Sequence, residues 1–400
     1  MRELSKRAST LGTENAFVVL GEVAGLVAEG REITSFCIGQ PDFPTPDNIC
    51  MAGIRAIADG HHGYTPSPGI QPLREAVANY FSRTRGVSIT ADDVVCGSGG
   101  KPFIGYTILS TTDYGAGHEV IYPNPGFPIY QSQIVANGAV PVPIHLRESN
   151  GFVFDLDDLE RKLNANTRLL ILCSPQNPTG SVISRADLEG IAKLLENYPD
   201  VWVYSDEVYS GLVYDGAFES IAAVDGMLER TVIADTASKT FAMTGWRIGY
   251  AANRALSPAF TRWVTNTDSC PAHPNQWAVV EALNGSQAAP EKMRDVFAKR
   301  RDHIVDGLNQ LDGMSCQKPG GAFYVWPNVT ETCRMTGIAN SEELRKRLLH
   351  EAGVAVLADI HFGTKVEGDG EHIRFSYASS LEDIDSGLQK IADFIRKNRK

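Results

Sequence analysis

Short apolar runs recur through the middle of the chain and alternate with stretches of helical periodicity. Several runs are continuously apolar, a pattern typical of strands that are covered on both faces of a sheet. Residues 184–196 illustrate the helical stretches, because they open on a capping-type Ser184 and carry leucine or isoleucine at 188, 191, 194 and 195. This alternation predicts an α/β fold with a mainly parallel sheet flanked by helices. The clearest strand candidates are residues 93–96, 119–122, 167–173, 201–204, 230–234 and 247–251.

The pattern changes near residue 290, where helical stretches rich in arginine and glutamate flank short strand-like runs. A chain of 400 residues is also long for a single hydrophobic core. We therefore expect a large domain over residues 46–289 and a smaller α+β domain formed by residues 1–45 and 290–400. The helical stretches are 290–311 and 341–352, and the strand-like runs are 322–326 and 373–377.

The loops that follow the predicted strands are not ordinary turns. In an open parallel sheet, functional side chains collect at the carboxyl ends of the strands. Each of these loops combines glycine or a polar turn residue with a group that could contact a ligand. Their sequences are GSGGK (97–101), PNPGF (123–127), SPQNPTG (174–180), SDEVY (205–209) and TASK (236–239).

Composition and charge narrow the possible partners. The formal net charge is -11, which argues against nucleic acid because phosphate binding needs a basic surface. The seven cysteines are scattered without zinc-ligand spacing, so we expect reduced thiols and no metal site. The N-terminal sequence lacks the apolar core of a signal peptide, and no apolar run is long enough for a membrane span. A soluble cytoplasmic protein with no nucleic-acid or membrane partner is expected.

The segment TASKTFAMTGWRIGY (236–250) places Lys239 among small and apolar residues, with Arg247 eight positions later. A lysine is usually solvated, but these neighbours predict partial desolvation of its ammonium group. Desolvation beside a second cation favours loss of the proton and gives an amine suited to Schiff-base chemistry. Arg247 is either that second cation or the anchor of an anionic ligand.

The segment Gly99-Gly100-Lys101-Pro102 joins a strand to a predicted helix. Proline suits the first turn of a helix, and the free amides at a helix N-terminus attract anions. The segment matches neither a Walker loop, because Val95 replaces its first glycine, nor a dinucleotide fingerprint, because Pro102 replaces its last one. It therefore predicts a cradle for a single phosphate.

The remaining loops offer groups with alternative interpretations. Asn177 could simply belong to a turn, Asp206 could cap a helix or pair with a buried cationic nitrogen, and Phe127 could be core or a stacking platform. Taken with Tyr209 and Lys239, these groups suit one ligand. That ligand has a flat ring with a phosphate arm, a ring nitrogen that stays protonated, a phenolate oxygen and an aldehyde, and it is pyridoxal 5′-phosphate.

At this point the chain resembles a pyridoxal-phosphate-dependent aminotransferase of class I/II, in the aspartate aminotransferase superfamily of fold type I. The resemblance spans nearly the whole chain and implies a seven-stranded sheet in the large domain. The matching motifs are IGQPDFPTP (38–46), GYTPSPGI (63–70), GSGGK, SPQNPTG, SDEVY, SKTFAMTGWRIGY (238–250) and HIRFSYAS (372–379).

The resemblance assigns a role to each site residue. Lys239 would be the catalytic residue, holding the cofactor covalently and moving the proton of the substrate α-carbon. Asp206 would pair with the ring nitrogen, and Phe127 would stack on the ring. Thr236 is a weaker candidate for phosphate contact. The implied cofactor-binding residues are Tyr64, Gly99, Gly100, Lys101, Phe127, Asn177, Asp206, Tyr209, Ser238 and Arg247.

Substrate binding and assembly follow from the same resemblance. Arg374 would fork onto the substrate α-carboxylate, helped by Gly39 and Asn177. Tyr64 resembles a tyrosine that reaches the phosphate of the neighbouring subunit, which implies a homodimer with shared active sites. Lys101 contacts the distal carboxylate of acidic substrates in some relatives, so the expected donor is aspartate or glutamate, with a 2-oxo acid such as 2-oxoglutarate as acceptor in a ping-pong reaction.

Departures from the family pattern leave alternatives open. Gly126-Phe127 stands where many relatives have Tyr-Trp, and the loop 358–372 differs from the usual one, which makes His361 and Phe362 candidates for substrate contact. The donor could instead be an aromatic amino acid or a specialised biosynthetic intermediate. A carbon–sulfur lyase could use the same lysine and arginines. A regulator with an aminotransferase-like module would need an added basic domain, and a protein that lost its cofactor would not keep these residues.

Overall fold

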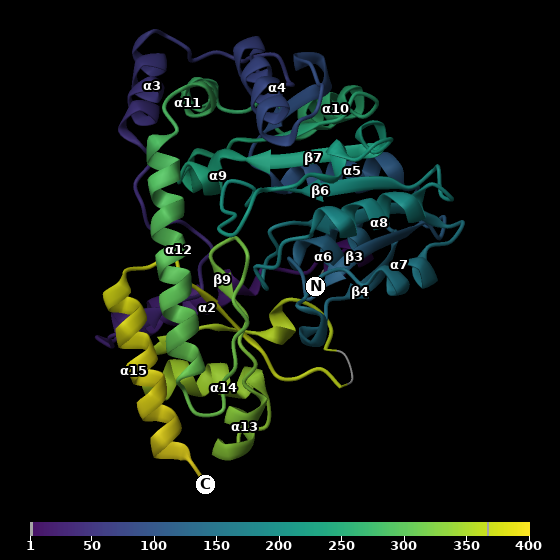
Figure 1. The fold of residues 1–400 in the computed structure, drawn as a ribbon. Helices are drawn as coiled ribbons and strands as arrows, with labels where there is room; N and C mark the ends of the chain where they lie inside the picture. The colour runs from purple at the N-terminus through teal and green to yellow at the C-terminus, as the bar shows by residue number, and fades with distance from the viewer. Residues whose placement is uncertain (1–2, 366–367) are drawn as a thin grey trace.

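The computed structural model describes residues 3–365 and 368–400, so residues 1–2 of the predicted 1–45 segment and residues 366–367 of the 358–372 loop lie outside the described residues. A seven-stranded sheet with the order β2-β8-β7-β6-β5-β3-β4 forms the centre of the larger part (Figure 1). Neighbouring strands are parallel, except that β8 runs antiparallel to both β2 and β7. The strands are β2 (Val94–Gly97), β3 (Glu119–Asn124), β4 (Val140–His145), β5 (Thr167–Cys173), β6 (Trp202–Asp206), β7 (Thr231–Thr236) and β8 (Gly249–Ala252).

Six of these strands coincide with the predicted apolar runs, and the sheet has the number of strands that the family resemblance implies. The strand that the pattern missed is β4. It contains Pro141 and Pro143 and lies at one end of the strand order. Proline cannot donate to a strand ladder and is therefore tolerated at a sheet edge, which explains why the run did not look like a strand.

Helices cover both faces of the sheet, as alternate side chains of the strands require. In β5, Leu170 and Leu172 pack with helix α8, whereas Leu169 and Ile171 pack on the other face with α5 and α10. Helix α8 begins where it was predicted, because the Ser184 hydroxyl accepts a hydrogen bond from the Asp187 amide at 3.1 Å. The flanking helices are α3 (Asp47–Ala58), α4 (Gln71–Arg85), α5 (Lys101–Thr111), α6 (Ile129–Ala136), α7 (Leu156–Lys162), α8 (Arg185–Leu195), α10 (Ser257–Thr267) and α11 (His273–Asn284).

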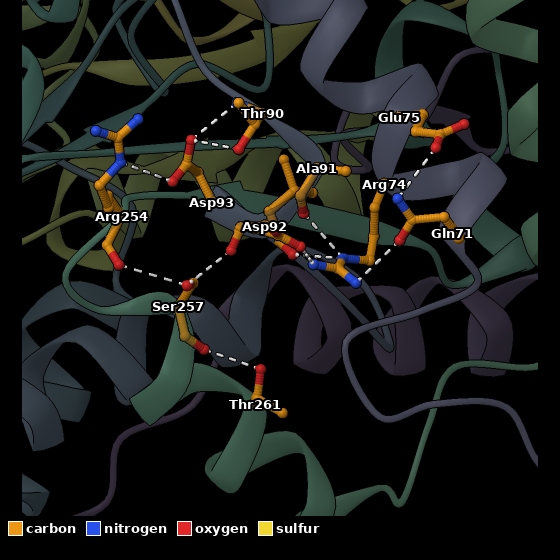
Figure 2. A network of polar contacts seen from close by, with 11 residues as sticks. Gln71, Arg74, Glu75, Thr90, Ala91, Asp92, Asp93, Arg254, Ser257 and Thr261 are labelled. Atoms are coloured by element: carbon orange, nitrogen blue, oxygen red, sulfur yellow. Dashed lines mark hydrogen bonds and ion pairs between the residues drawn. The ribbon is translucent and has the colours of Figure 1, made fainter.

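Polar contacts fix the start of β2, the strand that leads into the Gly99-Gly100 turn (Figure 2). Arg74 of α4 donates to the Ala91 carbonyl at 2.9 Å and to Asp92 Oδ1 at 2.9 Å. From the other side, Ser257 of α10 donates to the Asp92 carbonyl at 3.0 Å. The short turn before β2 is thereby tied to two helices, which positions the glycine-rich turn that follows the strand.

The N-terminal and C-terminal segments pack together beside the sheet. Strand β1 pairs in parallel with β10, and β12 lies between β11 and β9 in an antiparallel sheet. In Figure 1 the long helix α12 runs from beside α11 down to α14 and α15. The division into residues 46–289 and residues 1–45 with 290–400 stays a prediction. The elements are α1 (Lys6–Thr10), α2 (Asn15–Ala28), β1 (Thr34–Ser35), α12 (Ala288–Asn309), β9 (Tyr324–Val325), α13 (Thr330–Thr336), α14 (Ser341–Arg347), β10 (Val354–Ala355), β11 (Leu357–Ala358), β12 (Ile373–Ser376) and α15 (Leu381–Asn398).

All seven cysteines are free thiols. Among the residues that the structure describes, no helix has both the length and the apolar character needed to cross a membrane.

Candidate active site

The loops after β2, β3, β5, β6 and β7 border one cavity of about 480 Å³. Residues of the N-terminal segment, such as Gly39, and of the C-terminal segment, such as Arg374, complete its wall. The structure thus brings most of the predicted site residues into one place. Those that line the cavity are Gly39, Gly100, Lys101, Phe127, Asn177, Asp206, Tyr209, Ser238, Lys239, Arg247 and Arg374.

Lys239 lies on the short helix α9 (Ala237–Thr240), directly after β7. Its Nζ donates a hydrogen bond to the Gly39 carbonyl at 2.6 Å. Burial lowers the pKa of Lys239 to about 8; Glu14 opposes that shift, and the nearby cations Lys101, Arg374 and Arg247 add to it. A larger share of this amine is therefore neutral near pH 7 than in a solvated lysine, as a nucleophile requires.

Asp206 ends strand β6 on the floor of the cavity and is only 6% exposed. Burial raises the pKa of its carboxyl to about 6. Its Oδ2 accepts a hydrogen bond from the Tyr130 hydroxyl at 2.6 Å, while its buried Oδ1 has no partner within the described chain. Burying a carboxylate oxygen without a hydrogen-bond partner costs folding free energy. This oxygen is therefore suited to accept a hydrogen bond from a ligand, here from a cationic N–H group.

The turn between β2 and α5 packs against Arg247. Gly99 has φ +99°, which favours glycine, and a Cβ at this position would lie 2.2 Å from Arg247 Nη2, so a larger residue would displace the guanidinium. Arg247 itself has φ +56°, and its Nη1 donates to the Thr244 carbonyl at 2.9 Å. Near this guanidinium, the buried hydroxyls of Ser238 and Thr236 lie 2.9 Å apart. Backbone amides, a cation and hydroxyls of this kind can hold a phosphate group.

Arg374 on β12 reaches the cavity from the opposite side. Its Nη1 donates to Asn177 Oδ1 at 2.9 Å, and its Nη2 donates to the Cys37 carbonyl at 2.5 Å. The guanidinium lies over the rings of Tyr324, at 4.4 Å, and Phe362, at 4.8 Å. These contacts hold a planar cation in one orientation, which suits bidentate binding of a carboxylate.

Two tyrosines shape the wall between Lys239 and Arg374. The hydroxyls of Tyr209 and Tyr324 are 2.8 Å apart, so a ligand oxygen near Tyr209 would join an existing hydrogen-bonded pair. A Cβ at Gly39 would lie 2.0 Å from the Tyr324 hydroxyl oxygen. Position 39 must therefore be glycine for the two segments to approach this closely.

Lys101 is the first residue of α5 and forms an ion pair with Glu14 at the cavity. Its Nζ lies 5.6 Å from the ring centre of Phe17 and 5.4 Å from that of Phe127. The ring of Phe127 in turn packs edge-on against Tyr130. Lys101 thus borders the cavity, as predicted, but already has an acidic partner within the chain.

Four candidates are not among the residues that line the described cavity: Gly99, Tyr64, His361 and Phe362. Tyr64 is 90% exposed. Phe362 packs against the guanidinium of Arg374, and His361 Nε2 lies 3.4 Å from Glu342. His361 and Phe362 border a small neighbouring cavity together with Arg374, and their contact with a substrate stays a prediction.

The sequence did not identify several residues that the structure brings to the cavity. Tyr130 is the second residue of α6, six positions after the end of β3, and no motif there indicated a contact with Asp206. Glu14 and Phe17 also line the cavity, and they lie before residue 38, in a stretch that carried no motif. Tyr324 lies in a predicted strand, where an aromatic residue is ordinary. Only long-range packing reveals these roles.

Comparisons with known proteins agree with this arrangement. The family model described as aminotransferase class I and II matches residues 31–391. The chain is 35% identical to an aspartate aminotransferase of Bacillus sp. (strain YM-2), over 99% of this chain and 100% of the relative. It is 34% identical to an asparagine–oxo-acid transaminase of Streptococcus mutans serotype c, with the same coverage.

Solved structures show the same likeness in three dimensions. The aspartate aminotransferase from Rhizobium meliloti superimposes with a TM-score of 0.93 at 31% identity, and both chains are covered completely. The aspartate aminotransferase from Thermus thermophilus with maleate gives a TM-score of 0.91 at 34% identity, covering 98% of this chain and 100% of the other.

Proposed function

The chain belongs to the class I and II aminotransferases, and from this premise we propose that it is a pyridoxal-phosphate-dependent enzyme that moves an amino group from an amino acid to a 2-oxo acid in two half-reactions. One observation carries the proposal. A single cavity is lined by Lys239, by Gly100 and Arg247, and by Asp206, whose Oδ1 has no partner within the described part of the chain.

The donor set fits this cofactor. Pyridoxal phosphate supplies an aldehyde carbon that a lysine amine can bond and a protonated ring that takes up electrons from the substrate α-carbon. Asp206 Oδ1 would accept the hydrogen bond of the ring nitrogen, and Phe127 would pack against the ring face. Tyr209 and Asn177 would donate to the ring oxygen. The amides of Gly99 and Gly100, the hydroxyl of Ser238 and the guanidinium of Arg247 would hold the phosphate, with Lys101 and Thr236 beside them.

The same cavity provides the groups that a transamination needs from the protein. Arg374 would bind the substrate α-carboxylate, with the Gly39 backbone and Asn177 next to it. The amine of Lys239 would accept the proton of the substrate α-carbon and donate it again when the amino group is transferred. Its lowered pKa keeps part of the amine free to accept that proton near neutral pH.

For the donor, we propose aspartate or glutamate, with 2-oxoglutarate as acceptor. The names of the relatives support a small polar donor, since one is an aspartate aminotransferase and another an asparagine–oxo-acid transaminase. Lys101 provides a cation at the cavity for a distal carboxylate. A homodimer is part of the proposal, with Tyr64 of each subunit reaching the phosphate of the other, and its exposure of 90% leaves it free to do so.

A panel of amino donors tests the proposal. Purified enzyme loaded with pyridoxal phosphate is mixed with each donor, with and without 2-oxoglutarate, and the 2-oxo acid product is measured. We expect aspartate to give more than one equivalent of oxaloacetate per active site only when 2-oxoglutarate is present. Release of pyruvate and ammonia from a cysteine conjugate without any acceptor would instead identify a carbon–sulfur lyase.

A further inference from the structure

Glu14 and Lys101 form an ion pair at the wall of the cavity, between the rings of Phe17 and Phe127. The two charged side chains come from distant parts of the chain. Glu14 is the residue before helix α2, and Lys101 is the first residue of α5. Their side chains are 23% and 45% exposed, so both remain accessible to a molecule that enters the cavity.

The other charges of the cavity are accounted for by the proposed function. Among the residues that the structure describes, its lining holds the cations Lys101, Lys239, Arg247 and Arg374 and the acids Glu14 and Asp206. Lys239 and Asp206 act on the cofactor, Arg247 faces its phosphate, and Arg374 faces the α-carboxylate. Lys101 is the remaining cation that could bind a second carboxylate of the substrate, and it is already paired with Glu14.

The N-terminal segment holds Glu14 in place. The Gly12 amide donates to Ser132 Oγ of helix α6 at 2.9 Å, and a Cβ at Gly12 would lie 3.3 Å from that side chain. On the other side of Glu14, Ala16 and Val19 are buried. Because both ends of this short segment are anchored, the Glu14 carboxylate competes for Lys101 as part of the same molecule, at a high effective concentration.

We propose that Glu14 determines specificity by competing with the distal carboxylate of the substrate for Lys101; this rests on the proposed function. An acidic side chain must displace Glu14 from Lys101, whereas a neutral side chain leaves the pair intact and packs against Phe17, Phe127 and Ile38. One cavity can then bind acidic and neutral amino acids in turn. Glu14 sets the ratio of the affinities for acidic and neutral substrates, because it reduces the binding free energy that an acidic substrate obtains from Lys101.

Two ligands of equal length test this competition by binding alone. Succinate and butanoate differ in a terminal carboxylate against a terminal methyl group, and calorimetry on the cofactor-loaded enzyme gives the ratio of their dissociation constants. We expect Glu14→Gln to shift that ratio toward succinate by about twofold to fivefold, the range for a partly exposed charge pair. Glu29→Gln removes an exposed acid from the other end of the same helix and should leave the ratio unchanged.

A double-variant comparison ties the effect to Lys101. In a Lys101→Gln background, Glu14→Gln should no longer change the ratio, because the cation under competition is gone. An unchanged or reduced succinate preference in Glu14→Gln overturns the inference, as does the same shift in the absence of Lys101. Failure of the proposed function would give a different result, because no donor would then yield glutamate from 2-oxoglutarate. The ratios of dissociation constants would still decide the role of Glu14.

Discussion

The Tyr130 hydroxyl donates to Asp206 Oδ2 at 2.6 Å, and among the described residues the second oxygen of that buried carboxylate has no hydrogen-bond partner. Burial raises the pKa of Asp206 to about 6, and the hydrogen bond from Tyr130 opposes that rise. The tyrosine therefore helps to keep Asp206 ionised, and it directs the other oxygen toward the cavity.

This relationship predicts a pH dependence of cofactor binding. Asp206 must be a carboxylate to pair with a protonated ring nitrogen, so affinity should be present above pH 6 and should decline as the pH falls through about 6. Tyr130→Phe removes a hydrogen bond to the charged form, which raises the pKa of Asp206 further and moves the decline to higher pH. Titrating pyridoxal phosphate between pH 5 and 8 measures the midpoint. Tyr198→Phe is the control, because the Tyr198 hydroxyl donates to the Leu163 carbonyl away from the site, and it should leave the midpoint unchanged. A midpoint that moves to lower pH in Tyr130→Phe would contradict the assignment.

Gly99→Ala should weaken binding of the cofactor phosphate. The added methyl group would meet Arg247 Nη2 at 2.2 Å and displace the guanidinium, so we expect affinity to fall about tenfold to hundredfold, the value of one charged hydrogen bond. Gly86→Ala is the matched control, because Gly86 also has a positive φ but a Cβ there meets nothing within 4 Å. That variant should lose about 1 kcal/mol of folding stability and keep full affinity. Equal affinity loss in both variants would show that backbone strain, rather than Arg247, is responsible.

Arg374→Lys should raise KM for every amino and 2-oxo acid, whatever its side chain. Lysine keeps the charge but cannot reproduce the two-pronged geometry that Asn177 and the Cys37 carbonyl hold in place. We expect a rise of about tenfold to hundredfold, with a smaller change in kcat. Steady-state kinetics with one acidic and one neutral donor measures the effect. A rise confined to the acidic donor would place Arg374 at the distal carboxylate instead.

Arg85→Met should destabilise the protein strongly. Arg85 is buried and pairs with Glu207 at 2.9 Å and with Asp235 at 2.6 Å, next to the ends of β6 and β7. Removing the cation leaves two buried acids without compensation, which costs about 3–5 kcal/mol. Arg83→Met, an exposed position on the same helix, should cost less than about 1 kcal/mol. Urea unfolding of the two variants makes the comparison, and similar midpoints would show that the buried pairs do not stabilise the fold.

Much of the fold could be predicted because its strands are continuous apolar runs. Leu169 to Leu172 alternate between the two faces of the sheet, and both faces are buried, so each residue had to be apolar. The edge strand β4 escaped prediction because Pro141 and Pro143 interrupt its pattern. The direction of β8, antiparallel to its neighbours, also left no mark in the local sequence.

Part of the candidate site could likewise be predicted from the sequence, and part of it could not. Lys239, Asp206 and the Gly99-Gly100 turn lie at or just beyond the carboxyl ends of strands, so topology alone brings them to one edge of the sheet. Tyr130, Tyr324 and Glu14 reach the cavity through packing between segments far apart in the chain, which no local pattern records. The contact of Phe362 with the Arg374 guanidinium depends on the same long-range packing.

The identity of the lysine that bonds the cofactor tests the central proposal most directly. Enzyme incubated with pyridoxal phosphate is reduced with borohydride, digested and mapped by mass spectrometry. We expect one modified peptide, carrying the cofactor on Lys239, and no stable adduct in Lys239→Ala. An adduct on another lysine such as Lys101, or a protein that takes up no cofactor, would contradict the proposed active site.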